Sequence, residues 1–242
     1  MDQLLLAPGA SLGGARPKAS VTGPDGTLWI AKFPSVKDQI NIGAWEMVAA
    51  DMERAVGIRT PNSLIRKFNN EHHTYLSSRF DRYIDGSRIH FASAMTLLGH
   101  TDGVEGVSYL DLAEFIMRNG GNVDEDLREL WKRIVFNIAI KNTDDHLRNH
   151  GFLLSPGGWL LSPAYDVNPV YFGRGLTLNI SETDNSLDFE LALSVAHYFR
   201  VQLEMAKKMV NEVKAVVSNW NKLAKKYEIP SREQDLMAAA FE

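Results

Sequence analysis

The stretch that decides the fold is residues 142–166, NTDDHLRNHGFLLSPGGWLLSPAYD. It begins with a polar loop that carries Asp144 and, five residues later, Asn149. Two short apolar runs follow at residues 152–154 and 159–161. The Ser-Pro-Gly-Gly sequence between the two runs is typical of a tight turn, so the pair is predicted to form a β-hairpin.

The predicted hairpin leads to a second acid, Asp166, and returns it towards Asp144 and Asn149. Two strands of about three residues, each rising ~3.3 Å per residue, cannot carry their ends far apart. Three side chains with oxygen atoms would then meet, as Mg²⁺ bound to nucleotide phosphates requires. Protein kinases use an Asp as base, an Asn five residues later on a metal, and a further Asp on the metals. Asp144, Asn149 and Asp166 are predicted to fill these roles in that order; the alternative is that Asp and Asn are simply loop formers here.

A kinase site also needs a cation that reaches the phosphates from the other lobe. Lys32 lies between apolar residues in the strand-like run 28–33, as does the lysine of the Val-Ala-Ile-Lys strand of kinases. Alone, Lys32 would be interpreted as a lysine facing solvent from an edge strand; together with the downstream motif, it is predicted to bind phosphate. Glu46, on the helix that follows, is the expected carboxylate partner, with Asp51 and Glu53 as competitors.

The Gly-rich segment at residues 11–18, SLGGARPK, precedes Lys32, where a loop covering the phosphates belongs. It does not match Gly-x-Gly-x-x-Gly. It also departs from the Walker pattern, because Ala15 stands where a lysine is required, although Gly9 and Gly14 are correctly spaced. The segment alone therefore predicts only a turn.

Hydrophobic periodicity divides the chain into two parts, predicted as an N-lobe at residues 1–82 and a C-lobe at residues 83–242. The expected fold class is α+β, a bilobal protein-kinase-like fold with a small β-rich N-lobe and a larger α-helical C-lobe. Strands are expected in the N-lobe at 19–22, 28–33, 63–68 and 73–80, with one helix at 41–56. Helices are expected in the C-lobe at 108–119, 124–141, 189–199 and 201–227.

Composition excludes several classes of protein. The chain of 242 residues has no cysteine, so it holds neither disulfides nor Cys-ligated zinc. Its net charge of -4 lacks the basic excess typical of duplex binders, and no direct nucleic-acid contact is expected. We find no run of about 18 apolar residues and no basic N-terminal leader, so a cytoplasmic protein without membrane contact is expected.

Four segments carry a resemblance to a known family: residues 11–18 (SLGGARPK), 79–82 (RFDR), 142–149 (NTDDHLRN) and 165–169 (YDVNP). In this order they resemble the HipA family of bacterial toxin kinases, and the last two are the specific ones. The resemblance implies an atypical serine/threonine kinase that uses ATP and Mg²⁺ and is paired with a helix-turn-helix, HipB-like antitoxin. In the best-known branches the targets are aminoacyl-tRNA synthetases, whose phosphorylation slows translation.

Many relatives carry a further N-terminal subdomain before the Gly-rich loop, whereas this sequence starts almost at the loop. Three alternatives would explain this: a separate small protein supplies the subdomain, the subdomain is absent, or it has been trimmed from the sequence. This departure concerns the regulatory arrangement more than the chemistry.

The resemblance assigns roles residue by residue. It implies that Asp144 is the catalytic base, that Asn149 and Asp166 bind Mg²⁺, and that Lys32 and His146 contact ATP.

It also assigns the remaining nucleotide contacts. Gly13 and Gly14 would lie in the loop over the phosphates, and the backbone from Ser78 to Phe80 would form the hinge that binds adenine. Ser11 stands where the family carries an autophosphorylated, inhibitory serine. About two added negative charges there would disturb nucleotide binding.

Two alternatives from other classes remain. His146 and His150, four residues apart beside Asp144 and Asp145, could belong to a metal-dependent hydrolase. The other alternative is a catalytically inactive, kinase-like binding module that sequesters a partner. The hydrolase would consume its substrate without nucleotide, and the binding module would be indifferent to the loss of Asp144.

Overall fold

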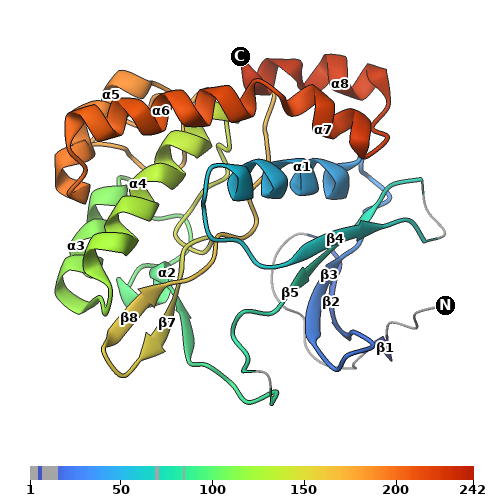
Figure 1. Ribbon diagram of the computed structural model, residues 1–242, viewed down its shortest axis with the longest axis horizontal. Helices are drawn as coiled ribbons and strands as arrows, with labels where there is room; N and C mark the ends of the chain where they lie inside the picture. The colour runs from blue at the N-terminus through green and yellow to red at the C-terminus, as the bar shows by residue number, and fades with distance from the viewer. Residues whose placement is uncertain (1–4, 7–15, 69–70, 84) are drawn as a thin grey trace.

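The computed structural model describes residues 5–6, 16–68, 71–83 and 85–242. It has two parts, an antiparallel sheet from the N-terminal third and a mainly helical part from the rest, as Figure 1 shows. The α+β class predicted from the sequence is confirmed. The sheet has the strand order β1-β2-β3-β5-β4. Its strands are β1 (Leu5–Leu6), β2 (Lys18–Thr22), β3 (Leu28–Lys32), β4 (Ser63–Arg66) and β5 (Thr74–Ser78).

The sheet is built around the β2–β3 hairpin. Its turn includes Gly26 at φ 82°, a left-handed conformation that glycine adopts without strain. Val21, Ala31 and Leu76 form a small buried cluster under the sheet. The register pairs Lys18 with Lys32, so these two lysines are cross-strand neighbours on one face.

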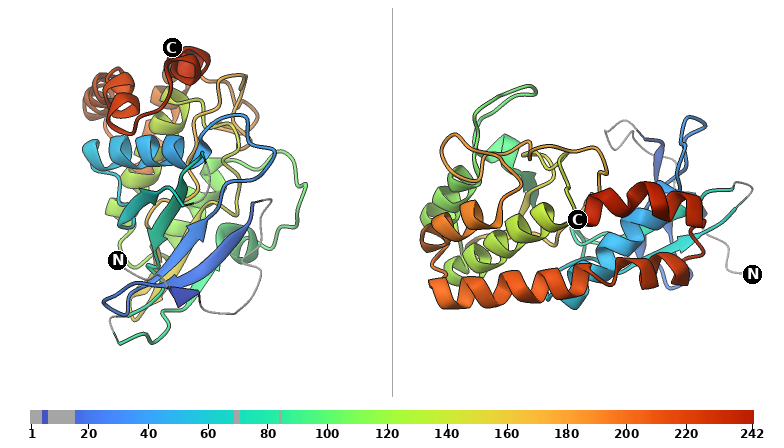
Figure 2. Two further views of the ribbon diagram at one scale, coloured as in Figure 1. Left: turned by 90° about the vertical axis from the view of Figure 1, so that its right-hand side faces the viewer. Right: turned by 90° about the horizontal axis from the view of Figure 1, so that it is seen from above.

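Helix α1 (Ile42–Ala55) belongs to the N-terminal part by sequence but packs into the main core. Asn41 caps its first turn by accepting a hydrogen bond from the Ala44 backbone N–H. Trp45 lies with its ring centroid 6.0 Å from the rings of both Trp220 and Phe241. Figure 2 shows the C-terminal helices running beside α1. The large core therefore crosses from one part of the molecule to the other.

The helical part is organised by α4 (Val123–Ala139), whose inward face is fully buried. Trp131 on this helix donates its indole N–H to the Ala192 carbonyl at 2.9 Å. The other helices are α2 (Ala94–Leu97), α3 (Tyr109–Asn119), α5 (Phe189–Val195), η1 (Ala196–Phe199), α6 (Leu203–Val217), α7 (Trp220–Lys226), α8 (Ser231–Met237) and η2 (Ala238–Phe241). No helix in the described ranges is long and apolar enough to cross a membrane.

The hairpin predicted after the polar loop is confirmed as β7 (Gly151–Ser155) and β8 (Gly158–Leu161), which are antiparallel. The sequence did not indicate the third strand of this sheet, β6 (Phe91–Ser93), which pairs with β7. A strand of three residues is too short to show a periodicity of its own.

The single helix predicted at residues 201–227 is wrong, because the chain breaks between α6 and α7. The side chains of Ser218 and Asn219 both bond back to the Ala215 carbonyl, at 2.9 and 2.8 Å. Such local side-chain bonds compete with the helical ladder. The apolar periodicity continues across the break, which is why the sequence suggested one helix.

Candidate active site

Lys32, at the end of β3, joins the two parts of the molecule. Its Nζ donates to Asp166 Oδ1 at 2.7 Å and to Glu46 Oε1 on α1. The Lys32 and Glu46 side chains are 12% and 6% exposed, so this ion pair is largely removed from solvent. The expected partner of Lys32 is thus confirmed as Glu46 rather than Asp51 or Glu53.

Lys18 is a second cation at the same acid, and sequence reasoning did not single it out. Its Nζ lies 3.6 Å from Asp166 Oδ2. The signal was present in the hairpin, because Thr22 pairs with Leu28 and the antiparallel register then places Lys18 opposite Lys32. Asp166 therefore faces two lysines from adjacent strands.

These contacts set the ionisation of the central pair. Burial by itself would raise the pKa of Asp166, but the charges of Lys32 and Lys18 outweigh it and lower the pKa to about 2. Burial would likewise lower the pKa of Lys32, but Glu46 and Asp166 raise it above its ordinary value. The site therefore presents a carboxylate and an ammonium group at neutral pH.

The loop after α4 presents the predicted base and one predicted metal ligand. Asp144 is exposed, whereas Asn149 is 8% exposed. The Asn149 amide donates from Nδ2 to the Asp144 carbonyl at 3.1 Å, and its backbone N–H donates to the carbonyl of His146, a half-buried residue, at 2.8 Å. The loop thus folds on itself, and the Asn149 side-chain oxygen is not used in the bond to Asp144.

Asp166 is held against this loop from both sides. It adopts φ 62°, a left-handed conformation that is uncommon outside glycine. Before it, the Tyr165 hydroxyl donates to the Arg148 carbonyl at 2.7 Å. After it, the Asn168 N–H donates to Asn142 Oδ1 at 3.4 Å. The segment around Asp166 and the loop of residues 142–149 therefore lie side by side.

The chain beyond Asp166 also packs on the loop, at Thr143. The Thr177 hydroxyl donates to the Thr143 carbonyl at 2.7 Å. A Cβ on Gly173 would lie 2.3 Å from Thr143 Cγ2, so glycine is required for this approach. These contacts hold Thr143, the residue before the exposed Asp144.

The predicted hinge lies beside Asp166 in space. Ser78 ends β5, and the ring of Phe80 lies 5.6 Å from that of Tyr165. Phe91 completes a three-ring group, 5.9 Å from Phe80 and 6.2 Å from Tyr165. Flat apolar rings of this kind could hold a planar base.

The predicted Gly-rich loop is not described in full. Ser11, Gly13 and Gly14 lie outside the described residues. At the edge of that segment, Arg16 makes a bidentate ion pair with Asp38 at 2.7 and 2.8 Å.

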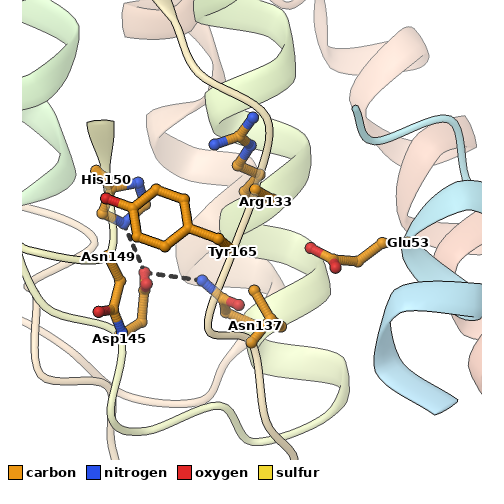
Figure 3. Close-up of a pocket in the computed structure, with 9 residues that line it drawn as sticks. Glu53, Arg133, Asn137, Asp145, Asn149, His150 and Tyr165 are labelled. Carbon is orange, nitrogen blue, oxygen red and sulfur yellow. Dashed lines mark hydrogen bonds and ion pairs between the residues drawn. The ribbon is translucent and has the colours of Figure 1, made fainter. Parts of the chain in front are cut away.

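A buried polar cluster under the loop was missed as a functional feature. Asp145, 2% exposed, accepts hydrogen bonds from Asn137 and Tyr109 and contacts the His150 ring. Figure 3 shows its contacts with Asn137 and His150. His150 is therefore engaged in the interior, and among the residues that the structure describes no group of three or more His, Asp or Glu side chains could hold a metal ion. The adjacent acids Asp144 and Asp145 were the only hint of this cluster that we find in the sequence. The sequence does not show which of the two is buried.

The donor set suits a hard cation shared with phosphate oxygens rather than an all-protein metal site. Asp166 offers a carboxylate that stays ionised, and Asn149 offers an amide oxygen on a fixed loop. Mg²⁺ characteristically uses one or two such protein oxygens and takes its other ligands from water and substrate phosphates. The residues therefore fit Mg²⁺ bound with a nucleotide.

A two-part kinase-like fold is defined by these elements, and solved structures show the same arrangement. A Shewanella oneidensis MR-1 HipA, solved with HipB and its operator DNA, matches with a TM-score of 0.72 and 18% identity over 96% of this chain and 63% of that one. The Helicobacter pylori proinflammatory kinase CtkA matches with a TM-score of 0.63 and 15% identity, over 98% of this chain and 95% of that one.

The sequence comparisons identify the family. The model of the HipA-like C-terminal domain matches residues 10–220, and the chain belongs to that family. A Haemophilus influenzae protein named "Putative kinase" is 25% identical over 146 residues, which are 55% of this chain and 43% of that protein. The chain thus matches less than half the length of this curated relative.

Proposed function

We propose that this chain transfers the γ-phosphoryl group of Mg-ATP to a serine or threonine hydroxyl of a protein. The observation that carries the proposal is the position of Lys32, which bonds both Glu46 and Asp166 while Asp166 lies against the loop of Asp144 and Asn149. Kinases need the same four parts, a lysine–glutamate pair, a metal-binding acid, a metal-binding amide and a base. Membership of the HipA-like family supports it.

The side chains divide the chemistry between them. Lys32 and Lys18 would bind phosphate oxygens, and Asn149 and Asp166 would hold Mg²⁺, which neutralises phosphate charge when bound. The exposed Asp144 would accept the hydroxyl proton. The hydroxyl oxygen forms the new bond to the γ-phosphorus, the bond from that phosphorus to the bridging oxygen breaks, and ADP leaves.

The cellular role that we propose is that of a HipA-type toxin. Its partner would be a HipB-like helix-turn-helix antitoxin, because the matched Shewanella protein was solved with HipB and operator DNA. Its substrate would be a cytoplasmic protein, with aminoacyl-tRNA synthetases as the first class to test, and DNA contact would be left to the antitoxin. A separate small protein similar to the N-terminal subdomain of relatives would be a further partner, and Ser11 would be the autophosphorylated residue.

The experiment is label transfer from γ-labelled ATP and Mg²⁺ to the chain itself and to a set of purified aminoacyl-tRNA synthetases. The wild-type chain should label a protein hydroxyl, with Ser11 identified by mass spectrometry. Asp144→Asn should lower the rate about 10²- to 10⁴-fold, the usual contribution of a general base. Asp124→Asn is the matched control, because that exposed acid lies on α4 and pairs with Arg200 at the surface.

Full activity of Asp144→Asn would refute its assignment as the base. A wild-type chain that arrests growth without transferring label, and still arrests growth after Asp144 or Asp166 is replaced, would be a binding module instead. Turnover of a substrate without nucleotide would indicate a hydrolase.

A further inference from the structure

Two adjacent acids in the candidate site have opposite surroundings. Asp144 is exposed, whereas Asp145 is 2% exposed and points into the protein. A buried carboxylate costs free energy unless charged or polar groups compensate it. Asp145 is not required by the transfer chemistry set out above, so its burial calls for another explanation.

Three elements supply the compensation, and all reach the same oxygen of Asp145. The Tyr109 hydroxyl from α3 donates to Oδ2 at 2.5 Å, and the Asn137 amide from α4 donates at 2.8 Å. His150 Nε2, on the residue immediately before β7, lies 2.8 Å from it. Burial by itself would raise the pKa of Asp145, but His150 and Tyr109 outweigh it and lower the pKa below its ordinary value. The group is therefore a satisfied, ionised carboxylate in the interior.

The network continues from Asp145 to the other end of the site. Asn137 accepts from Asn142 Nδ2 at 3.0 Å through its side-chain oxygen. Asn142 in turn accepts from the Asn168 N–H, two residues beyond Asp166. One chain of bonds thus links the residue after Asp144 with the turn that carries Asp166.

Figure 3 shows the part of this chain of bonds that joins Asp145 to Asn137, and the bond from Asp145 to His150. Asp145, Asn137 and His150 line a small cavity together with Asn149, the predicted metal ligand. Each hydrogen bond that Asp145 makes in this low-dielectric interior favours one arrangement of the chain, although His150 Nδ1 has no hydrogen-bond partner among the described residues. The loop that carries Asp144 and Asn149 consequently has its shape fixed from beneath.

We infer that Asp145 is the positioning residue of the catalytic loop, holding Asp144 and Asn149 in place through Tyr109, Asn137 and His150. The inference rests on the proposed kinase function and extends it to a residue that touches neither nucleotide nor acceptor. A loop displaced by about 1 Å can lower a catalytic rate about 10²-fold. Replacing Asp145 should therefore impair turnover far more than nucleotide affinity, which depends on Lys32 and the hinge.

The first test compares Asp145→Asn with Asp126→Asn in the full chain. Asp126 is an equally buried acid on α4, bonded to Arg59 and the Leu161 N–H outside the loop. Asp145→Asn should lower kcat about 10- to 100-fold, with the ATP dissociation constant changed less than about threefold. Asp126→Asn should leave kcat near the wild-type value even where it lowers the melting temperature. Unchanged kcat in Asp145→Asn, or an equal loss in both variants, would overturn the inference.

Rescue separates positioning from simple destabilisation. Asn137→Asp alone sets two carboxylates against each other, whereas Asn137→Asp combined with Asp145→Asn restores one donor and one acceptor. The double variant should have a kcat at least about tenfold higher than that of Asp145→Asn alone. An equally low kcat in the two variants would count against the inference. If Asp145→Asn does not fold, Tyr109→Phe removes a single donor and should still lower kcat severalfold without changing ATP affinity; an unchanged kcat would again overturn it.

Amide hydrogen exchange tests the positioning role of Asp145 independently of the proposed kinase activity. Amides at residues 142–149 should exchange at least about tenfold faster in Asp145→Asn than in wild type and not in Asp126→Asn, because local opening follows local stability. This result holds whether or not the wild-type chain transfers phosphate. Unchanged exchange would reject the positioning role, whereas a wild-type chain without label transfer would reject the kinase proposal alone.

Discussion

The two sides of the candidate site are supported by hydrophobic cores of very different size. The sheet that carries Lys18 and Lys32 rests on a small buried cluster of Val21, Ala31 and Leu76. The loop that carries Asp144 follows α4, whose inner face lies in a core that extends across the helical part. The two lysines thus lie on a sheet with a small core, whereas Asp144 lies on a loop that adjoins the large core. We expect the sheet to be the more easily perturbed side of the candidate site, and three perturbations test this contrast.

The largest effect is expected at Lys32, where the two sides meet. Lys32→Met should lower kcat/KM for ATP about 10²- to 10³-fold, the cost of removing one fixed electrostatic contact to a transition state. It would also leave the buried Glu46 without its cation, which is destabilising. Initial-rate kinetics with a thermal melt measure both effects.

Lys18→Met is the matched control for that substitution. Lys18 lies on the same face but is 3.6 Å from Asp166, against 2.7 Å for Lys32. The factor by which Lys18→Met lowers kcat/KM for ATP should be less than a tenth of the factor for Lys32→Met. Equal losses would show that the two lysines share the task and that the sheet does not single out Lys32.

The second comparison removes one buried side chain from each core. Ile134 on α4 and Leu76 on β5 are 0% and 1% exposed. Substitution by alanine should lower the free energy of unfolding by about 2–5 kcal/mol in either case, and more for Ile134→Ala, because the larger core leaves a better-enclosed cavity. Urea unfolding measures the difference.

Leu76→Ala and Ile134→Ala should also differ in their effect on KM for ATP. Leu76→Ala should raise KM for ATP severalfold, since β5 pairs with β3 beside Lys32, whereas Ile134→Ala should not. An Ile134→Ala variant with the larger KM change would show that the sheet is not the more easily perturbed side.

The smallest effect concerns Glu53, on the helix that joins the two regions. Glu53 is 3% exposed, and burial raises the pKa of its carboxyl to about 8. Between pH ~4.5 and ~8 the folded chain therefore keeps a proton that the unfolded chain has lost. The free energy of unfolding should decline as pH rises through this window.

Glu53→Gln should remove that decline and raise the free energy of unfolding at pH 8 by about 1–3 kcal/mol relative to wild type. Urea unfolding at pH 5 and pH 8 measures it, with exposed Glu182→Gln as the control. The same decline in Glu53→Gln and wild type would mean that Glu53 is ionised in the folded chain.

Much of the site was predictable because its signals are local. The five-residue spacing of Asp144 and Asn149 and the turn after Phe152 are properties of a short segment, and β7 and β8 form where that turn predicts. The Lys32 strand was likewise indicated by its own apolar run, and the helix of Glu46 by its own periodicity. Each of these features depends on residues within one or two turns of chain.

Other features had no local signature. Glu46 and Glu53 are seven residues apart on α1 and both buried, and only the way α1 packs brings Glu46 to Lys32. The break at Ser218 was hidden by an apolar pattern that continues beyond it. Side-chain bonds and packing decided these cases against the sequence pattern.

The sequence by itself determined the order of the candidate catalytic motifs, the hairpin that returns Asp166, and the family to which the chain belongs. Tertiary structure alone decided that Lys18 joins Lys32 at Asp166 and that Asp145 rather than Asp144 is buried. The physical reason is the range of the interactions. Turns and periodicity depend on neighbouring residues, whereas burial and ion pairs across more than a hundred residues depend on how completed elements pack.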